Sequence, residues 1–154
     1  MPGGLLLTRA ISVRSPAALT WRWLCQVAVA PYSYDWIDNR GRRSPDTLTP
    51  GADQLELGQT MAVIFRLTSY DDVHQWTAIT SPRGRRLFGP VAITYAAEPD
   101  GPDTRIVCRL AVAARGPIAR ARAHALAWGD LVMMRRQLLN LKALAERDAV
   151  ALGH

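Results

Sequence analysis

The longest hydrophobic pattern in the chain runs from Pro117 to Asp148 and predicts one amphipathic helix. At ~100° per residue, one face of this helix carries Ala127, Leu131, Met134, Leu138, Leu141 and Ala145. Gly116 and Pro117 mark its start, because a proline in the first turn gives up no hydrogen bond. Asp130 and Gln137 fall within the same arc. So wide an apolar face needs a broad apolar surface opposite it, and its two polar residues need partners.

Shorter segments upstream alternate between apolar and polar residues, as strands do. Residues 5–13 form the first, and Ser15 followed by Pro16 predicts the N-cap and first turn of a short helix over 17–27. Four further strands are predicted over residues 59–68, 73–81, 87–97 and 104–114. Gly89–Pro90 is expected to break the third of these. Turn-forming residues separate the four segments, so consecutive antiparallel pairing is the simplest topology.

Alternation also assigns each strand residue to a face of the sheet. The inward set is mainly apolar and contains Met61, Val63, Phe65, Leu67, His74, Trp76, Ala78, Val91, Ile93, Tyr95, Ile106, Cys108, Leu110 and Val112. The outward set includes Arg66, Thr94, Arg105 and Arg109, which suit solvent. A sheet with one apolar face, opposite a helix with a wide apolar stripe, predicts a two-layer α+β domain with the helix across the concave face.

Residues 32–50 show no sustained period and are rich in turn-forming residues, so a loop is predicted there. This loop is dense in aromatic residues, with Tyr32, Tyr34 and Trp36 close together. Amphipathic aromatic side chains commonly close one end of a core. The alternative is that they form a gate over a pocket.

Length and composition predict one domain over residues 1–154, with the last few residues disordered. No window resembles a secretion signal or a membrane span, which leads us to expect a cytoplasmic protein. Cys25 and Cys108 lie far apart and are expected to be buried apolar residues. His74, His124 and His154 show no metal-ligand spacing, so neither a metal nor a cofactor is expected.

The net charge of +6 comes from arginine, since Lys142 is the only lysine. The arginines are scattered along the chain without interleaved aromatic residues, unlike those of a single-strand nucleic-acid-binding surface. We therefore expect no nucleic-acid partner. A basic outer sheet face leaves open a role as a protein-interaction module with an acidic partner.

Two segments resemble a known family: SYDWIDNRGRRSPD, residues 33–46, and AWGDLVMMRRQLLNLKALAE, residues 127–146. With the predicted element order, they are similar to the START-like, or SRPBCC, superfamily, and to its bacterial polyketide cyclase/dehydrase-like subgroup. The resemblance implies the helix-grip fold, in which a curved antiparallel sheet wraps around a long C-terminal helix. It also implies a hydrophobic cavity for a lipid, a polyketide or a similar molecule. It carries over no catalytic motif.

The predicted ligand-binding residues are the inward aromatic residues, the aromatic loop and the inner helix face: Tyr34, Trp36, Phe65, Trp76, Tyr95, Asp130, Met134, Gln137 and Leu138. A buried carboxylate is costly unless it is paired. Asp130 is therefore either a structural anchor, with Arg9 as one possible partner, or, with Gln137, the group that orients the polar end of an apolar ligand.

The function predicted from these features is to bind a small hydrophobic ligand between the sheet and the C-terminal helix, as a carrier or a sensor. The alternative is a polyketide cyclase/dehydrase-like enzyme that uses the same cavity, with Asp130, His74 or Tyr95 positioning or moving protons. The sequence leaves the oligomeric state open.

Overall fold

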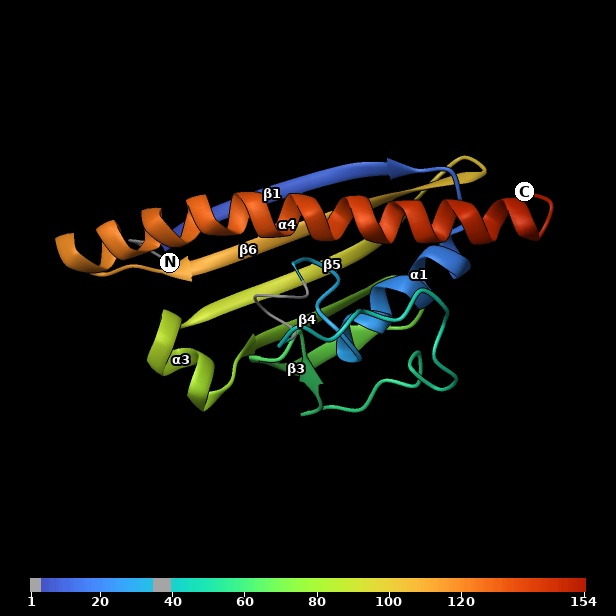
Figure 1. Cartoon of the computed structure of the whole chain (residues 1–154). Helices are drawn as coiled ribbons and strands as arrows, with labels where there is room; N and C mark the ends of the chain where they lie inside the picture. The colour runs from blue at the N-terminus through green and yellow to red at the C-terminus, as the bar shows by residue number, and fades with distance from the viewer. Residues whose placement is uncertain (1–3, 35–39) are drawn as a thin grey trace.

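Six antiparallel strands form one sheet in the order β1-β6-β5-β4-β3-β2 in the computed structural model (Figure 1). The structure describes residues 4–34 and 40–154, apart from the side chain of Asp130. The strands are β1 (Gly4–Val13), β2 (Thr60–Met61), β3 (Phe65–Asp71), β4 (Gln75–Thr80), β5 (Val91–Asp100) and β6 (Asp103–Ala113). The helices are α1 (Ala17–Cys25), the 3-10 helix η1 (Gln26–Ala28), α3 (Pro82–Phe88) and α4 (Pro117–Ala151).

The long helix α4 lies along the sheet and packs against α1 and β1 (Figure 1). The predicted helix-grip α+β fold is therefore confirmed, with the short helix after the first strand in its expected place. The helix ends at Ala151 rather than at the predicted Asp148. Beyond it, the His154 ring lies 3.2 Å from the Asp103 carboxylate. The predicted disorder of the last residues stays a prediction.

Strand register places the predicted inward residues in rows across one face. One row joins Arg9, Cys108, Tyr95 and Trp76 on four neighbouring strands. The outward residues Thr94 and Arg109 form a row of their own on the other face. Because side chains alternate along each strand, the apolar rows pack under the helices, while the polar rows meet solvent.

Three predictions about local structure were wrong. The segment that follows Ser81 was expected to be a turn, but it is the helix α3, which Ser81 caps by accepting a hydrogen bond from the backbone N–H of Gly84. The predicted strand over 59–68 is broken at Ala62 and Val63, which both have positive φ, and Val63 is exposed. Ser15 does not cap α1, because Pro16 occupies the N-cap position and no side chain caps that end.

The inward placement of His74 was also wrong. Val73 adopts a φ of 61°, which turns the chain just before β4, so His74 lies exposed in the hairpin turn. Among the residues that the structure describes, no helix is long and apolar enough to cross a membrane.

Candidate ligand-binding site

A chain of hydrogen bonds, here called the polar bridge, joins Tyr95, Gln137 and Pro31 inside the molecule. The Tyr95 hydroxyl donates to Gln137 Oε1 and also lies 3.0 Å from the sulfur of Met134. Gln137 Nε2 in turn donates to the Pro31 carbonyl at 2.5 Å. Tyr95 and Gln137 are only 1% and 6% exposed. The bridge therefore fixes the middle of α4 to β5 and to the start of the aromatic loop, at a depth where unpaired polar groups are costly.

An aromatic stack supports the same place from the sheet side. Trp76 packs on Tyr95 with 4.7 Å between ring centroids and 29° between ring planes. The Trp76 indole N–H donates to the Leu24 carbonyl at 3.2 Å, so this ring is also tied to α1. The structure thus brings together four predicted residues, Trp76, Tyr95, Met134 and Gln137. They contact one another and line neither of the hollows described below.

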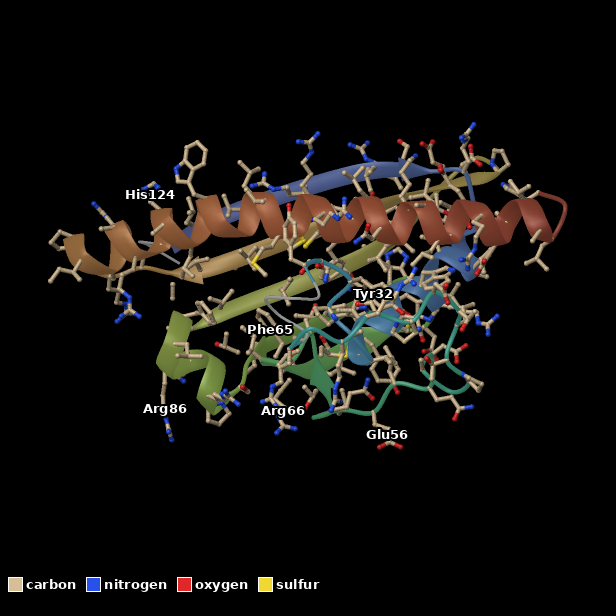
Figure 2. All side chains as sticks on the ribbon, viewed as in Figure 1. Tyr32, Glu56, Phe65, Arg66, Arg86 and His124 are labelled. Carbon is tan, nitrogen blue, oxygen red and sulfur yellow. The ribbon has the colours of Figure 1, made fainter. Side chains whose placement is uncertain are left out.

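The aromatic loop is held to α4 through Tyr32. Its hydroxyl donates to the Pro45 carbonyl at 2.7 Å and accepts from Gln26 Nε2 at 2.8 Å, while Asn140 Nδ2 donates to its carbonyl at 2.9 Å. The side chain is buried, and it meets Trp23 edge-on with centroids 6.0 Å apart. For Tyr32 this packing favours the interpretation as a plug of the core (Figure 2). Tyr34 is half-buried, and Trp36 lies outside the described residues.

Packing is uneven along α4. Toward its C-terminus, Leu141, Ala145 and Ala149 are fully buried. The first half of α4, residues 117–133, is packed more loosely, because five residues on its inner side stay partly exposed. These residues are Ala119, Leu126, Ala127, Leu131 and Met133. The sheet repeats this difference, with Val13 and Ile106 closed off but Leu5, Leu7 and Phe65 partly exposed. The interior is therefore closed at one end and incompletely filled at the other.

A cavity of about 170 Å³, here called the end cavity, opens at the looser end. It is lined by Gly4, Leu5, Ala114, Arg120, Ala123 and His124, and so lies between the edge of the sheet and the first half of α4. His124 sits at the end of the molecule that also holds α3 (Figure 2). Apolar walls with a guanidinium and an imidazole at the rim suit an apolar molecule that has one polar or anionic group.

A larger hollow of about 740 Å³ adjoins this end but has a different character. Its lining includes the outward row Leu6, Ala111, Ala92 and Ile79, together with Arg85 of α3, and none of its lining residues belongs to α4. Leu6 and Ile79 are exposed. We therefore assign this hollow to the outer face of the sheet rather than to the space gripped by the helix.

The predicted site residues do not line either hollow. Leu138 is buried in the core, and Phe65 packs against that core while staying partly exposed. The residues that line the end cavity were not among the predicted site residues. The inward register of Leu5 was an available signal. Arg9 Nε is buried and meets no hydrogen-bond partner within the described part of the chain. Its pairing with Asp130 stays a prediction, since the side chain of Asp130 is not described.

Both cysteines are buried, as predicted. Burial raises the pKa of the Cys25 thiol, and Asp53 and Asp72 add to the shift, so this thiol is held in its protonated, unreactive form. Within residues 4–34 and 40–154, no group of three or more His, Cys, Asp and Glu side chains is placed to hold a metal ion.

Comparison with known proteins places the fold. No protein-family model and no curated protein sequence matches this chain. Among solved structures, protein MLL2253 of Mesorhizobium loti matches with a TM-score of 0.54 at 12% identity, covering 93% of this chain and 98% of its own. A major latex protein family member of Arabidopsis thaliana matches with a TM-score of 0.50 at 11% identity, covering 90% and 94%.

The aromatase/cyclase StfQ of the steffimycin biosynthetic pathway matches with a TM-score of 0.55 at 12% identity. The match covers 95% of this chain and 52% of StfQ, which has two domains. Identities this low speak to the fold alone. Together with the six-stranded sheet and its long C-terminal helix, they show that the chain has the helix-grip fold.

Proposed function

We propose that the protein binds a small apolar ligand between the sheet and the first half of α4, as a carrier or a sensor. The observation that supports this most directly is the uneven packing of α4. Apolar side chains of the helix and of the sheet face each other there and stay partly exposed, next to the end cavity. Leaving apolar surface in contact with water is unfavourable, so a ligand that fills this space stabilises the folded state.

In this proposal the end cavity is the entrance, and the polar bridge marks the inner limit of the site. Met134 lies at that limit, and Arg120 and His124 at the entrance meet the polar end of the ligand. A cavity near 150 Å³ holds about one aromatic ring. A larger ligand requires the first half of α4 to move outward, and this is the half that packs least tightly.

The alternative of a cyclase-like enzyme has less support. Among the candidate catalytic groups, His74 lies exposed in a turn outside the interior. The Tyr95 hydroxyl is engaged by Gln137 and Met134. A general acid or base must reach the reacting group, so neither residue is placed for proton transfer in this arrangement.

A matched pair of substitutions on α4 tests the site. Ala123 is buried and lines the end cavity, while Ala125 is exposed on the other side of the same helix. The probe is N-phenyl-1-naphthylamine, a neutral molecule that fluoresces when it leaves water. Ala123→Phe fills the entrance and is expected to weaken probe binding at least tenfold, whereas Ala125→Phe leaves binding unchanged. Equal affinities in the two variants would overturn the proposed site.

Native mass spectrometry of protein made in several expression hosts tests the function itself. The proposal predicts a bound apolar molecule that N-phenyl-1-naphthylamine displaces. Consistent absence of any bound molecule, combined with no probe binding by the unmodified protein, would refute a carrier or sensor role.

A further inference from the structure

The outward side of α4 carries a second apolar stripe that is exposed along its length. At ~100° per residue, Ile118, Ala121, Ala125, Trp128, Val132 and Leu139 fall within an arc of about 80°, opposite the buried face. All of these residues are exposed, with Ile118 at 78%, Trp128 at 73% and Val132 at 53%. The stripe, here called the outer stripe, extends over ~31 Å of helix. Exposed apolar surface that is continuous over this length marks an interaction site.

Arginine residues line both edges of the outer stripe. Arg135 and Arg136 are exposed and fall on opposite edges of it. Arg122 lies just beyond the edge that Arg136 occupies, and its guanidinium donates to the Leu87 carbonyl at 3.1 Å. Between residues 115 and 136 the only acidic residue is Asp130. The partner of this surface is therefore expected to be apolar at its centre and negatively charged on both sides.

A second copy of the chain fits this surface poorly. In an antiparallel helix pair centred near Trp128, Arg135 and Arg136 would lie opposite residues 120–122, where Arg122 flanks the same stripe. A parallel pair would place Arg135 of each copy beside Arg136 of the other. Both arrangements bring like charges together along an apolar seam, which is destabilising.

We propose that the outer stripe docks α4 onto an anionic lipid bilayer. A helix of this kind lies in the plane of the interface, with its apolar face among the acyl chains and its cations at the phosphates. A tryptophan at the centre of the stripe suits that depth. In this orientation the end cavity, which is lined by the inner side of the same part of α4, lies across the helix from the bilayer. The proposal does not rest on the ligand-binding function, since it follows from the exposed side of the helix.

Vesicle sedimentation tests the docking. Mixed vesicles of phosphatidylcholine and phosphatidylglycerol are expected to bind the protein at low salt, and pure phosphatidylcholine vesicles to bind it weakly. Trp128→Ser combined with Val132→Ser should weaken partitioning at least tenfold, because the lost apolar side chains no longer enter the bilayer. Arg135→Gln and Arg136→Gln should each weaken partitioning about five-fold, and high salt should also weaken it, because both reduce the attraction to the anionic headgroups.

The matched control is Leu57→Ser, which removes a 68% exposed apolar residue outside α4, next to Glu56 on the side of the molecule away from that helix (Figure 2), and should leave partitioning unchanged. Arg105→Gln, on the outer sheet face, is the corresponding charge control. All of the substituted side chains are exposed, so melting temperatures should stay within error of the unmodified protein. The proposal is overturned if anionic vesicles bind no better than neutral ones, or if Leu57→Ser weakens partitioning as much as the stripe variants do.

Discussion

The polar bridge makes a quantitative prediction about stability. Tyr95→Phe keeps the ring and its stack on Trp76 but removes the hydroxyl that donates to Gln137. Both residues are nearly inaccessible, at 1% and 6% exposure, so water cannot replace the missing donor. A buried acceptor left without a partner costs about 1–3 kcal/mol. We therefore expect Tyr95→Phe to lower the free energy of unfolding by that amount, measured by urea denaturation with an unchanged slope.

A double-mutant cycle separates the bond from other effects of the substitution. Gln137→Met removes the same hydrogen bond from the other side, together with the donor to Pro31. It should cost less in the Tyr95→Phe background than in the unmodified protein, by about 0.5–3 kcal/mol. The control is Thr94→Val, which removes a hydroxyl bonded at 2.8 Å to Thr77 on the half-buried outer face and should cost less than about 1 kcal/mol. Strict additivity in the cycle, or equal costs for Tyr95→Phe and Thr94→Val, would refute the bridge.

Two further predictions concern packing and pH. Gly84→Ala should destabilise the protein by about 1–3 kcal/mol in thermal or urea unfolding, because the new Cβ would lie 2.6 Å from the Ile64 carbonyl oxygen. Gly129→Ala, whose new Cβ meets no atom within 4 Å, should stabilise it by up to about 1 kcal/mol. Changes of the same sign in the two variants would contradict this prediction. Burial alone would raise the pKa of Glu146, but the Arg14 backbone N–H and Lys142 together lower it. The ionised carboxylate therefore stabilises the fold at pH values above its unfolded pKa. This contribution is lost as the pH falls through the folded pKa. Glu146→Gln should therefore cost about 1 kcal/mol at neutral pH and nothing at strongly acid pH in parallel urea titrations, and a cost independent of pH would contradict the assignment.

The parts of the fold that follow from a long, regular hydrophobic period were predictable from the sequence. The strand expected over 104–114 is β6, Asp103–Ala113, and the helix expected from Pro117 begins at that residue. In both elements, many apolar side chains recur with one period and face the same layer. One or two residues that break the pattern therefore do not change the secondary structure that forms. The order of elements then left few topologies, and consecutive antiparallel pairing is confirmed.

The parts that failed depend on single backbone angles or on tertiary contacts. Helix α3 contains Pro82 and Gly84 and has no apolar period, so its Ser81 cap, its fit against Ile64 and the Arg122 hydrogen bond to the Leu87 carbonyl hold it in place. Val63 favours strands by type, yet it adopts a φ of 70° in a turn.

The candidate site was predicted incompletely for a similar reason. Alternation shows that Tyr95 and Gln137 face inward, but it does not show that they bond to each other instead of lining a space. The uneven packing of α4 depends on the distance between helix and sheet at each end, which one-dimensional periodicity does not contain. The outer stripe was missed because the prediction followed the wide apolar face of the helix, whereas Ile118, Trp128 and Val132 form a second apolar row on its outer side.

The most direct test of the account is a methyl NMR titration of the protein with N-phenyl-1-naphthylamine. The proposed site predicts shift changes at Leu5 and Leu126, which face the incompletely filled end, and none at Leu141 or Val13 in the closed end. Shift changes confined to the outer sheet face, such as those of Ile79, or an absence of shifts at saturating probe, would contradict ligand binding between the sheet and α4.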